Sequence, residues 1–189
     1  MGKLFIVTAP SGAGKTSLVS ALLERVEQTH KISRVITHTT KSPRLGDRDG
    51  KDYHFLSVDQ FEQKIKEDFF LEWSLAYGHY YGSPKNIVPM LEQGNSFLMI
   101  LDSQGAQAIA SLLSEAILIW ISVPNIEILK KRLLLRKSEN LEQVNKRILL
   151  AQKEIQEKSK KNFFKYVVCN DIFEKALLEL ESIVNKELM

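Results

Sequence analysis

The amino-acid sequence predicts an α/β fold in which helices flank a central parallel sheet. Four short, nearly continuous apolar runs are each followed by a segment with helical periodicity. Strands that are apolar at almost every position are typical of parallel sheets buried on both faces. The chain has 189 residues, of which 44% are hydrophobic and 26% charged, as in globular proteins. We therefore expect one α/β domain that spans residues 1–189.

The predicted elements follow one another from the N-terminus. Residues Leu4–Val7 form the first strand, and the apolar residues of the segment 16–26 recur at the spacing of a helix. Three later runs of the same kind are expected to be strands, at residues 97–101, 117–123 and 166–169. The apolar stripe that begins at Ile172 predicts a last helix that packs on the sheet.

Two segments depart from this alternation. Residues 32–83 contain short runs of Thr, Tyr, Phe and His around a turn-rich stretch, with one helix at about 58–66. We expect them to form an inserted, mostly antiparallel subdomain. Residues 126–161 are polar, basic and strongly helical, which is the character of a lid. The core would then consist of residues 1–31, 84–125 and 162–189, and Trp73 and Trp120 are expected to be buried.

Charge and cysteine content limit the classes of function. The chain has 26 Lys and Arg against 23 Asp and Glu, and the net charge of +3 suits an anionic ligand but is too small to indicate a nucleic-acid partner. The N-terminal apolar stretch is soon interrupted by Pro10 and Gly12, which excludes a membrane span there. A single cysteine, Cys169, cannot form an internal disulfide. We expect a soluble, cytoplasmic protein without a membrane partner.

A phosphate-binding loop is the strongest chemical signal. It lies between the first strand and the first helix and consists of Ala9, Pro10, Ser11, Gly12, Ala13, Gly14, Lys15, Thr16 and Ser17. Its glycines let backbone amides turn toward phosphate oxygens, and the start of the helix adds the positive end of its dipole. In this pattern Lys15 contacts the β- and γ-phosphates and Thr16 offers its hydroxyl to Mg²⁺. The loop predicts the P-loop NTPase form of the α/β fold, although Ala9 stands where the strict pattern has Gly.

A carboxylate follows the apolar run at residues 97–101. Asp102 would lie at the carboxyl end of a parallel strand, where α/β proteins bind their ligands. A role at the Mg²⁺ ion, through a bridging water, is one interpretation. Aspartate is also a common helix N-cap, and this alternative stays open.

An ordered set of further motifs resembles the guanylate kinases of bacteria. The motifs extend from Leu4 to Lys186 and include HTTKSPRLGDRDGKDYHF at 38–55, FLEW at 70–73, YYGS at 80–83, LDSQGAQ at 101–107, KKRLLLR at 130–136, NKR at 145–147 and CND at 169–171. The resemblance implies that the 32–83 insertion is a GMP-binding domain. It also implies reversible, Mg²⁺-dependent transfer of a phosphoryl group from ATP to GMP or dGMP, which gives ADP and GDP.

The resemblance implies a set of GMP-binding residues, namely Thr37, Lys41, Arg44, Tyr53, Glu72, Tyr81, Ser83 and Asp102. The planar guanidinium of Arg44 suits bidentate contact with a phosphate, to which Lys41 adds a charge and the two tyrosines add hydroxyl donors. Glu72 would accept hydrogen bonds from N1 and the 2-amino group of guanine, which adenine cannot match. The hydroxyls of Thr37 and Ser83 suit the carbonyl of the base.

Three arginines of the helical section match the lid arginines of that family. Arg132, Arg136 and Arg147 would neutralise the transferring phosphoryl group and, with Lys15 and Arg44, are the expected catalytic residues. The resemblance also places the adenine-contacting corner of the ATP site at Asn170 and Asp171.

The sequence departs from the family pattern at three places. Lys41 stands where Arg is usual, Ile100 stands where an acid is usual, and LRKSEN at 135–140 lacks the usual glycine. One alternative function is a non-catalytic, guanylate-kinase-like module that binds phosphopeptides or proteins, but such modules typically lose the phosphate loop. Another is a P-loop kinase with a different acceptor, which would leave Thr37 and Glu72 unexplained. Either a monomer or a homodimer is compatible with the sequence.

Overall fold

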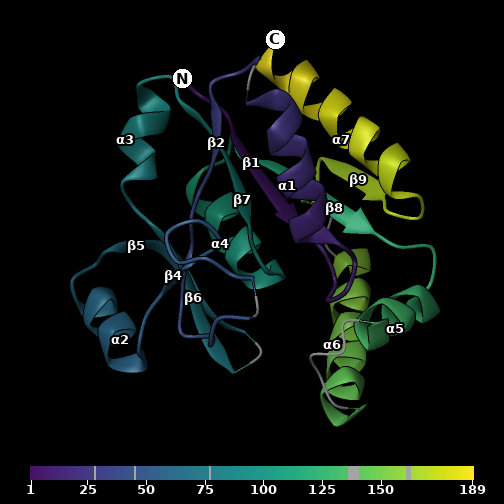
Figure 1. Ribbon diagram of the computed structural model, residues 1–189. Helices are drawn as coiled ribbons and strands as arrows, with labels where there is room; N and C mark the ends of the chain where they lie inside the picture. Colours follow the sequence, from purple (N-terminus) through teal and green to yellow (C-terminus); the bar gives the residue numbers. More distant parts are fainter. Residues whose placement is uncertain (28, 45, 77, 136–140, 161–162) are drawn as a thin grey trace.

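A five-stranded parallel sheet forms the centre of the structure, which is a computed structural model (Figure 1). It describes residues 1–27, 29–44, 46–76, 78–135, 141–160 and 163–189. The strands lie in the order β2 (Ile32–Arg34), β7 (Ser96–Ile100), β1 (Leu4–Thr8), β8 (Ile117–Ser122) and β9 (Tyr166–Cys169). All four pairings are parallel. The predicted central parallel sheet is therefore confirmed.

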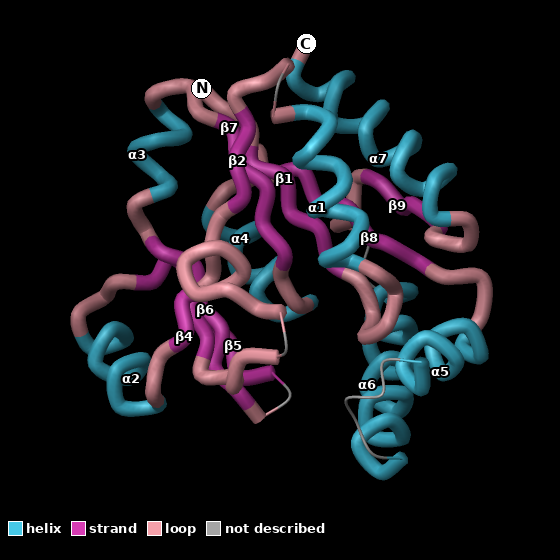
Figure 2. The backbone as a smooth tube through the Cα atoms, in the orientation of Figure 1, coloured by secondary structure: helices cyan, strands magenta, loops and turns pink. Residues whose placement is uncertain are grey.

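Helices cover both faces of this sheet (Figure 2). They are α1 (Lys15–Val26) and α7 (Phe173–Leu188) on one face, and α3 (Ile87–Glu92) and α4 (Ser103–Leu112) on the other. Phe5 and Val7 of β1 belong to the buried cluster under α1 and α7, whereas Leu4 and Ile6 belong to the cluster under α3 and α4. This alternation explains why the strand is apolar at successive positions.

A second, smaller sheet is formed by β4 (His54–Phe55), β3 (His38–Thr39), β6 (His79–Pro84) and β5 (Phe70–Ala76), in that order. Two of its pairings are antiparallel and one is parallel, which agrees with a mostly antiparallel insertion. Helix α2 (Val58–Lys66) packs on it through Phe61, whose ring stacks 4.4 Å from that of Phe70 and 5.1 Å from that of Tyr80. A capping box between Ser57 and Gln60 fixes the start of α2.

The structure differs from two sequence predictions. The segment Ile32–Arg34, expected in the insertion, pairs with β7 and belongs to the parallel sheet. It is only three residues long and has one buried side chain, so it lacks the apolar run that marks the other strands. Trp120 is buried as expected, but Trp73 is 47% exposed because it lies on the outer face of β5.

Two further helices, α5 (Ile126–Leu135) and α6 (Leu141–Lys160), lie beside the loop that joins β1 to α1 (Figure 1). Leu129 and Leu133 of α5 are fully buried, and a Cβ added at Gly12 would lie 3.2 Å from Leu133 Cγ. The helical section therefore packs directly on the predicted phosphate loop. Within the described ranges, no helix combines the length and the apolar character that a membrane crossing requires.

Candidate active site

A cavity of about 740 Å³ lies between the phosphate loop, the second sheet and α6. The predicted site residues that line it are Pro10, Ser11, Gly12, Ala13, Gly14, Lys15, Thr16, Thr37, Lys41, Arg44, Tyr53, Glu72, Tyr81, Asp102 and Arg147. The described residues that line it do not include the predicted Ala9, Ser17, Ser83, Arg132, Asn170 and Asp171. Arg136 lies outside the described residues. One cavity thus contains most of the residues predicted to bind ATP and most of those predicted to bind GMP.

The phosphate loop has the backbone conformation that its glycines predict. Gly12 and Gly14 have φ values of 86° and 92°, in the left-handed region that favours glycine. Gly14 is the N-cap of α1 and supplies no side chain to bond the first amides of the helix, so these amides can bind an anion. Lys15 lines the cavity, and its ammonium donates to the carbonyl of Ala9 at 2.6 Å. Ala9 therefore contributes a backbone group to the loop.

The helical section contacts the loop from two directions. Arg147 of α6 lines the cavity and donates from Nε to the hydroxyl of Ser11 at 2.8 Å. Glu154 of α6, which the sequence analysis did not identify, accepts from the backbone amide of Ser11 at 3.3 Å. Arg132 of α5 instead lies behind the loop and donates to the carbonyl of Asn170 at 2.9 Å. Of the described lid arginines, Arg147 therefore reaches the cavity.

Strand β5 has an inverted pattern of polarity. Glu72 and Ser74 are buried and line the cavity, whereas Trp73 and Leu75 on the other face are exposed. In an ordinary half-buried strand the apolar side chains are the buried ones. The buried face of β5 is polar because it borders a cavity. This inversion was visible in FLEWSL, but only the fold shows which face is inside.

The Glu72 carboxylate is enclosed by specific partners. Ser83 is fully buried and donates its hydroxyl to Glu72 Oε1 at 2.6 Å. A Cβ added at Gly105 would lie 2.8 Å from Glu72 Oε2, so glycine at this position leaves room for the carboxylate. Burial raises the pKa of Glu72 to about 7, the charge of Asp102 adds to this, and the Ser83 hydroxyl opposes it. Ser83 thus contacts Glu72 and does not line the cavity itself, and Gly105 is a lining residue that the sequence analysis did not single out.

Asp102 is both a cavity residue and a helix cap. Its Oδ1 accepts from the backbone amides of Gln104 and Gly105 at 2.8 Å each, which fixes the start of α4. Its Oδ2 accepts from the hydroxyl of Ser74 at 2.6 Å. The N-cap alternative is therefore correct, and the same carboxylate still faces the cavity.

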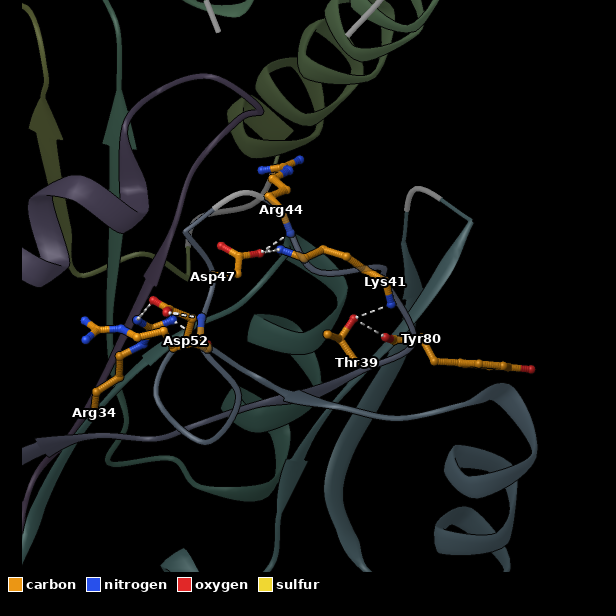
Figure 3. A network of polar contacts seen from close by, with 8 residues as sticks. Arg34, Thr39, Lys41, Arg44, Asp47, Asp52 and Tyr80 are labelled. Carbon is orange, nitrogen blue, oxygen red and sulfur yellow. Dashed lines mark hydrogen bonds and ion pairs between the residues drawn. The ribbon is translucent and has the colours of Figure 1, made fainter. Parts of the chain in front are cut away.

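A network around Asp47 holds the loop that follows β3 (Figure 3). Asp47 Oδ2 accepts from the Lys41 ammonium at 2.8 Å and from the Arg44 backbone amide at 3.0 Å. Burial raises the pKa of Asp47, but the bond from Lys41 and the Arg44 amide outweigh it, so this pKa lies below its ordinary value. The network brings Lys41 and Arg44 to the same cavity. Asp47 was missed because an Asp in a turn-rich segment also suits an ordinary turn.

Two tyrosines line the cavity beside this network. The rings of Tyr53 and Tyr81 lie 6.2 Å apart, and the Lys41 ammonium lies 4.3 Å from the centroid of the Tyr53 ring. Burial raises the pKa of both phenols, that of Tyr81 to about 12. Both hydroxyls are therefore protonated at neutral pH and can donate to an anion.

Comparisons with known proteins agree with this geometry. The guanylate kinase family model matches residues 1–187. The guanylate kinase of Shewanella denitrificans is 39% identical over 97% of this chain and 86% of its own, and that of Clostridium perfringens strain 13 is 41% identical over 98% and 84%. The chain belongs to the guanylate kinase family. A crystal structure of guanylate kinase from Anaplasma phagocytophilum matches with a TM-score of 0.81 at 26% identity, covering all of this chain and 87% of that one.

The structure shows what surrounds two of the departures from the guanylate kinase pattern. Lys41 is paired with Asp47 and lies over Tyr53, so its single charge is held in place although it lacks the fork of an arginine. Ile100 lines the cavity and packs against the buried cluster under α1 and α7. It therefore adds apolar surface where the pattern has an acid. In the third departure, at 135–140, residues 136–140 lie outside the described residues.

The cavity offers oxygen donors to a divalent metal, which kinases of this family generally require. Thr16 and Asp102 both line it, and hydroxyl and carboxylate oxygens are the donors that Mg²⁺ prefers. Asp102 Oδ1 already accepts from two backbone amides, whereas Oδ2 accepts from the Ser74 hydroxyl and has a second lone pair, so a contact through water fits Oδ2. Within the described residues, no group of three or more His, Cys, Asp or Glu side chains could hold a metal by itself.

Proposed function

We propose that this chain transfers the γ-phosphoryl group of ATP to the 5′-phosphate of GMP or dGMP, reversibly and with Mg²⁺, and so gives ADP and GDP or dGDP. One observation carries the proposal. A single cavity joins a phosphate loop to a buried carboxylate, Glu72, that Ser83 and Gly105 hold in one position. The loop can bind a chain of phosphates, and the carboxylate can accept hydrogen bonds from a base that has adjacent N–H donors.

Phosphoryl transfer requires that two anions meet, and the charges of the cavity serve this purpose. Lys15 and Arg147 line the side of the phosphate loop, and Lys41 and Arg44 line the side of the second sheet. The acceptor phosphate is itself a nucleophile at neutral pH, so no covalent intermediate with the protein is needed. Catalysis then consists of aligning the two phosphate groups and neutralising their negative charges in a site that excludes water.

Selection of guanine follows from the acceptor character of Glu72. Its ionised carboxylate accepts from the N1–H and the 2-amino group of guanine, while Thr37 lines the same cavity with a hydroxyl. Adenine has neither of these donors and would leave a buried carboxylate unpaired. The carboxylate of Asp102, held by Ser74, lies close enough to raise the pKa of Glu72 and extends this acceptor surface.

Thr16 and Asp102 would hold the Mg²⁺ ion, the latter through water. The ion would supply positive charge at the transferring phosphoryl group. We also propose that the ATP site extends from residues 9–17 to Asn170 and Asp171, with Arg132 and Arg136 as the other lid arginines of the family motif. The single cysteine and the nucleotide substrates support a cytoplasmic location. The segments 35–83 and 126–161 serve as GMP-binding region and lid, since residues 32–34 belong to the parallel sheet.

A coupled assay of ADP production tests this function. Purified protein is supplied with ATP, Mg²⁺ and each nucleoside monophosphate in turn. We expect turnover with GMP and dGMP, little turnover with AMP, CMP or UMP, and none when EDTA removes the metal. Binding of GMP without turnover would instead favour the non-catalytic binding module. Efficient turnover of another monophosphate would refute the assignment of the acceptor.

A further inference from the structure

A side chain from the end of the edge strand β9 lies behind the phosphate loop. Asn170 is only 3% exposed, and its side-chain Nδ2 donates to the backbone carbonyl of Ala13 at 2.7 Å. Its own backbone amide donates to Ser122 at the end of β8 at 2.9 Å, which anchors it to the parallel sheet. The contact connects residues 157 positions apart in the sequence, so the loop does not hold its shape by local bonds alone.

The loop leaves room for this side chain at one glycine. A Cβ at Gly14 would lie 2.6 Å from Asn170 Nδ2, closer than real contacts permit, and Gly14 has a φ of 92°. Arg132 also donates from Nη2 to the carbonyl of Asn170 at 2.9 Å. The side-chain amide of Asn170 is therefore held against Ala13 and Gly14, and Arg132 holds its backbone carbonyl.

We infer that Asn170 is a positioning residue that orients the peptide between Ala13 and Gly14 for binding the phosphates of ATP. This inference rests on the proposed function, because it takes the ATP phosphates as the ligand. In a planar trans peptide the carbonyl and the amide point in opposite directions. With the Ala13 carbonyl bonded to Asn170, the Gly14 amide points away from Asn170, and both loop residues line the cavity. A rotated peptide would present a carbonyl oxygen to the phosphates and repel them.

This role differs from a contact with the base. The family resemblance implies a base contact, for which Asn170 Oδ1 would be the acceptor from an amino group of the base; this atom is buried and has no hydrogen-bond partner among the described residues. A base contact affects only nucleotides that carry that amino group. A positioning role affects every ligand whose phosphates occupy the loop, whatever its base.

The test compares the affinities of Mg-ATP and Mg-ITP, whose base lacks the 6-amino group, in titration calorimetry with the full chain. For Asn170→Ala we expect both affinities to fall by about tenfold, which corresponds to ~1.4 kcal/mol. The affinity for GMP and the unfolding temperature should stay unchanged. Asn95→Ala is the matched control, because Asn95 Nδ2 makes the same kind of bond to the Met90 carbonyl, at 3.0 Å, away from the cavity.

Two outcomes would overturn the inference. An unchanged affinity for Mg-ITP would leave Asn170 at most a base contact. A parallel loss of GMP affinity and unfolding temperature would show a general structural role. If Asn170→Ala does not fold, Asn170→Ser supplies the same comparison, since its hydroxyl is too short to reach Ala13. Turnover of GMP by the unaltered chain reports on the proposed function separately, because these titrations with Mg-ATP and Mg-ITP contain no acceptor.

Discussion

The two walls of the cavity are built in different ways. The donor wall, which is the side proposed to bind ATP, is built mainly on one contiguous stretch, residues 10–16, whose backbone is shaped by two glycines with positive φ. The acceptor wall is assembled from side chains of β5, β6, α4 and the loop after β3, and other side chains hold its key groups, as Ser83 holds Glu72 and Asp47 holds Lys41. The donor wall therefore depends on backbone conformation, and the acceptor wall depends on pairs of side chains.

The largest effect is expected from the charged side chain that the phosphate loop itself contributes to the donor wall. Lys15→Ala removes the ammonium that lines the cavity and donates to Ala9. We expect kcat to fall by at least about a thousandfold, because this charge stabilises the transferring phosphoryl group. The assay of ADP production with GMP measures it.

Lys130→Ala, which changes an exposed lysine of α5, is the matched control for this variant. It should keep normal turnover. If Lys15→Ala had a kcat close to that of the unaltered chain, the assignment of this loop as the phosphate-binding loop of a kinase would be contradicted.

The next effect concerns selectivity on the acceptor wall. Glu72→Gln keeps the shape of the side chain but replaces one acceptor oxygen by a donor, so guanine loses a partner. We expect kcat/KM for GMP to fall by about a hundredfold, and the preference for GMP over AMP to narrow by a similar factor. Glu62→Gln on the exposed face of α2 should leave both unchanged. An unaltered ratio of GMP to AMP turnover would exclude Glu72 from base recognition.

The donor wall and the parallel sheet could be predicted because their signals are local. The apolar runs marked β1, β7, β8 and β9 to within a residue or two at each end. The loop between β1 and α1 is recognised from nine consecutive letters, since its function depends on glycines and on its place between a strand and a helix. A helix was predicted at about residues 58–66, and α2 has these bounds in the structure, where a capping box marks its start.

The partners on the acceptor wall could not be predicted from local patterns. Glu72 and Ser83 are eleven residues apart, and Ser74 and Asp102 are twenty-eight apart, so the sheet register and the packing of α4 on β5 bring them together. The resemblance of motifs identified Glu72, but it did not show that a residue without a side chain, Gly105, must lie beside the Glu72 carboxylate. The exposed Trp73 was wrongly expected in the core for the same reason, because burial on β5 depends on which face borders the cavity.

A smaller effect on KM is expected from Asp47, which does not line the cavity but holds two residues that do, Lys41 and Arg44. Asp47→Asn weakens the bond to Lys41 and removes the charge that accepts from Arg44. We expect KM for GMP to rise by about tenfold, with KM for ATP unchanged, because the loss is confined to the acceptor phosphate. Asp59→Asn in the first turn of α2 is the matched control. An equal rise in both KM values would show that Asp47 supports the whole fold instead.

The smallest expected effect is a dependence of KM on pH, which should appear for GMP on the acceptor wall and not for ATP on the donor wall. The pKa of Glu72 is raised to about 7, so as pH falls below 7 the carboxyl gains a proton and can no longer accept from guanine. Between pH 7.5 and 6.5 the ionised fraction falls by about threefold, and KM for GMP should rise by the same factor while KM for ATP does not. Glu72→Gln is the control, because it keeps the titration of the GMP phosphate and removes that of the carboxyl. An identical pH dependence in both proteins would show that Glu72 stays ionised throughout this range, and that its neighbours compensate for its burial more fully than Ser83 alone can.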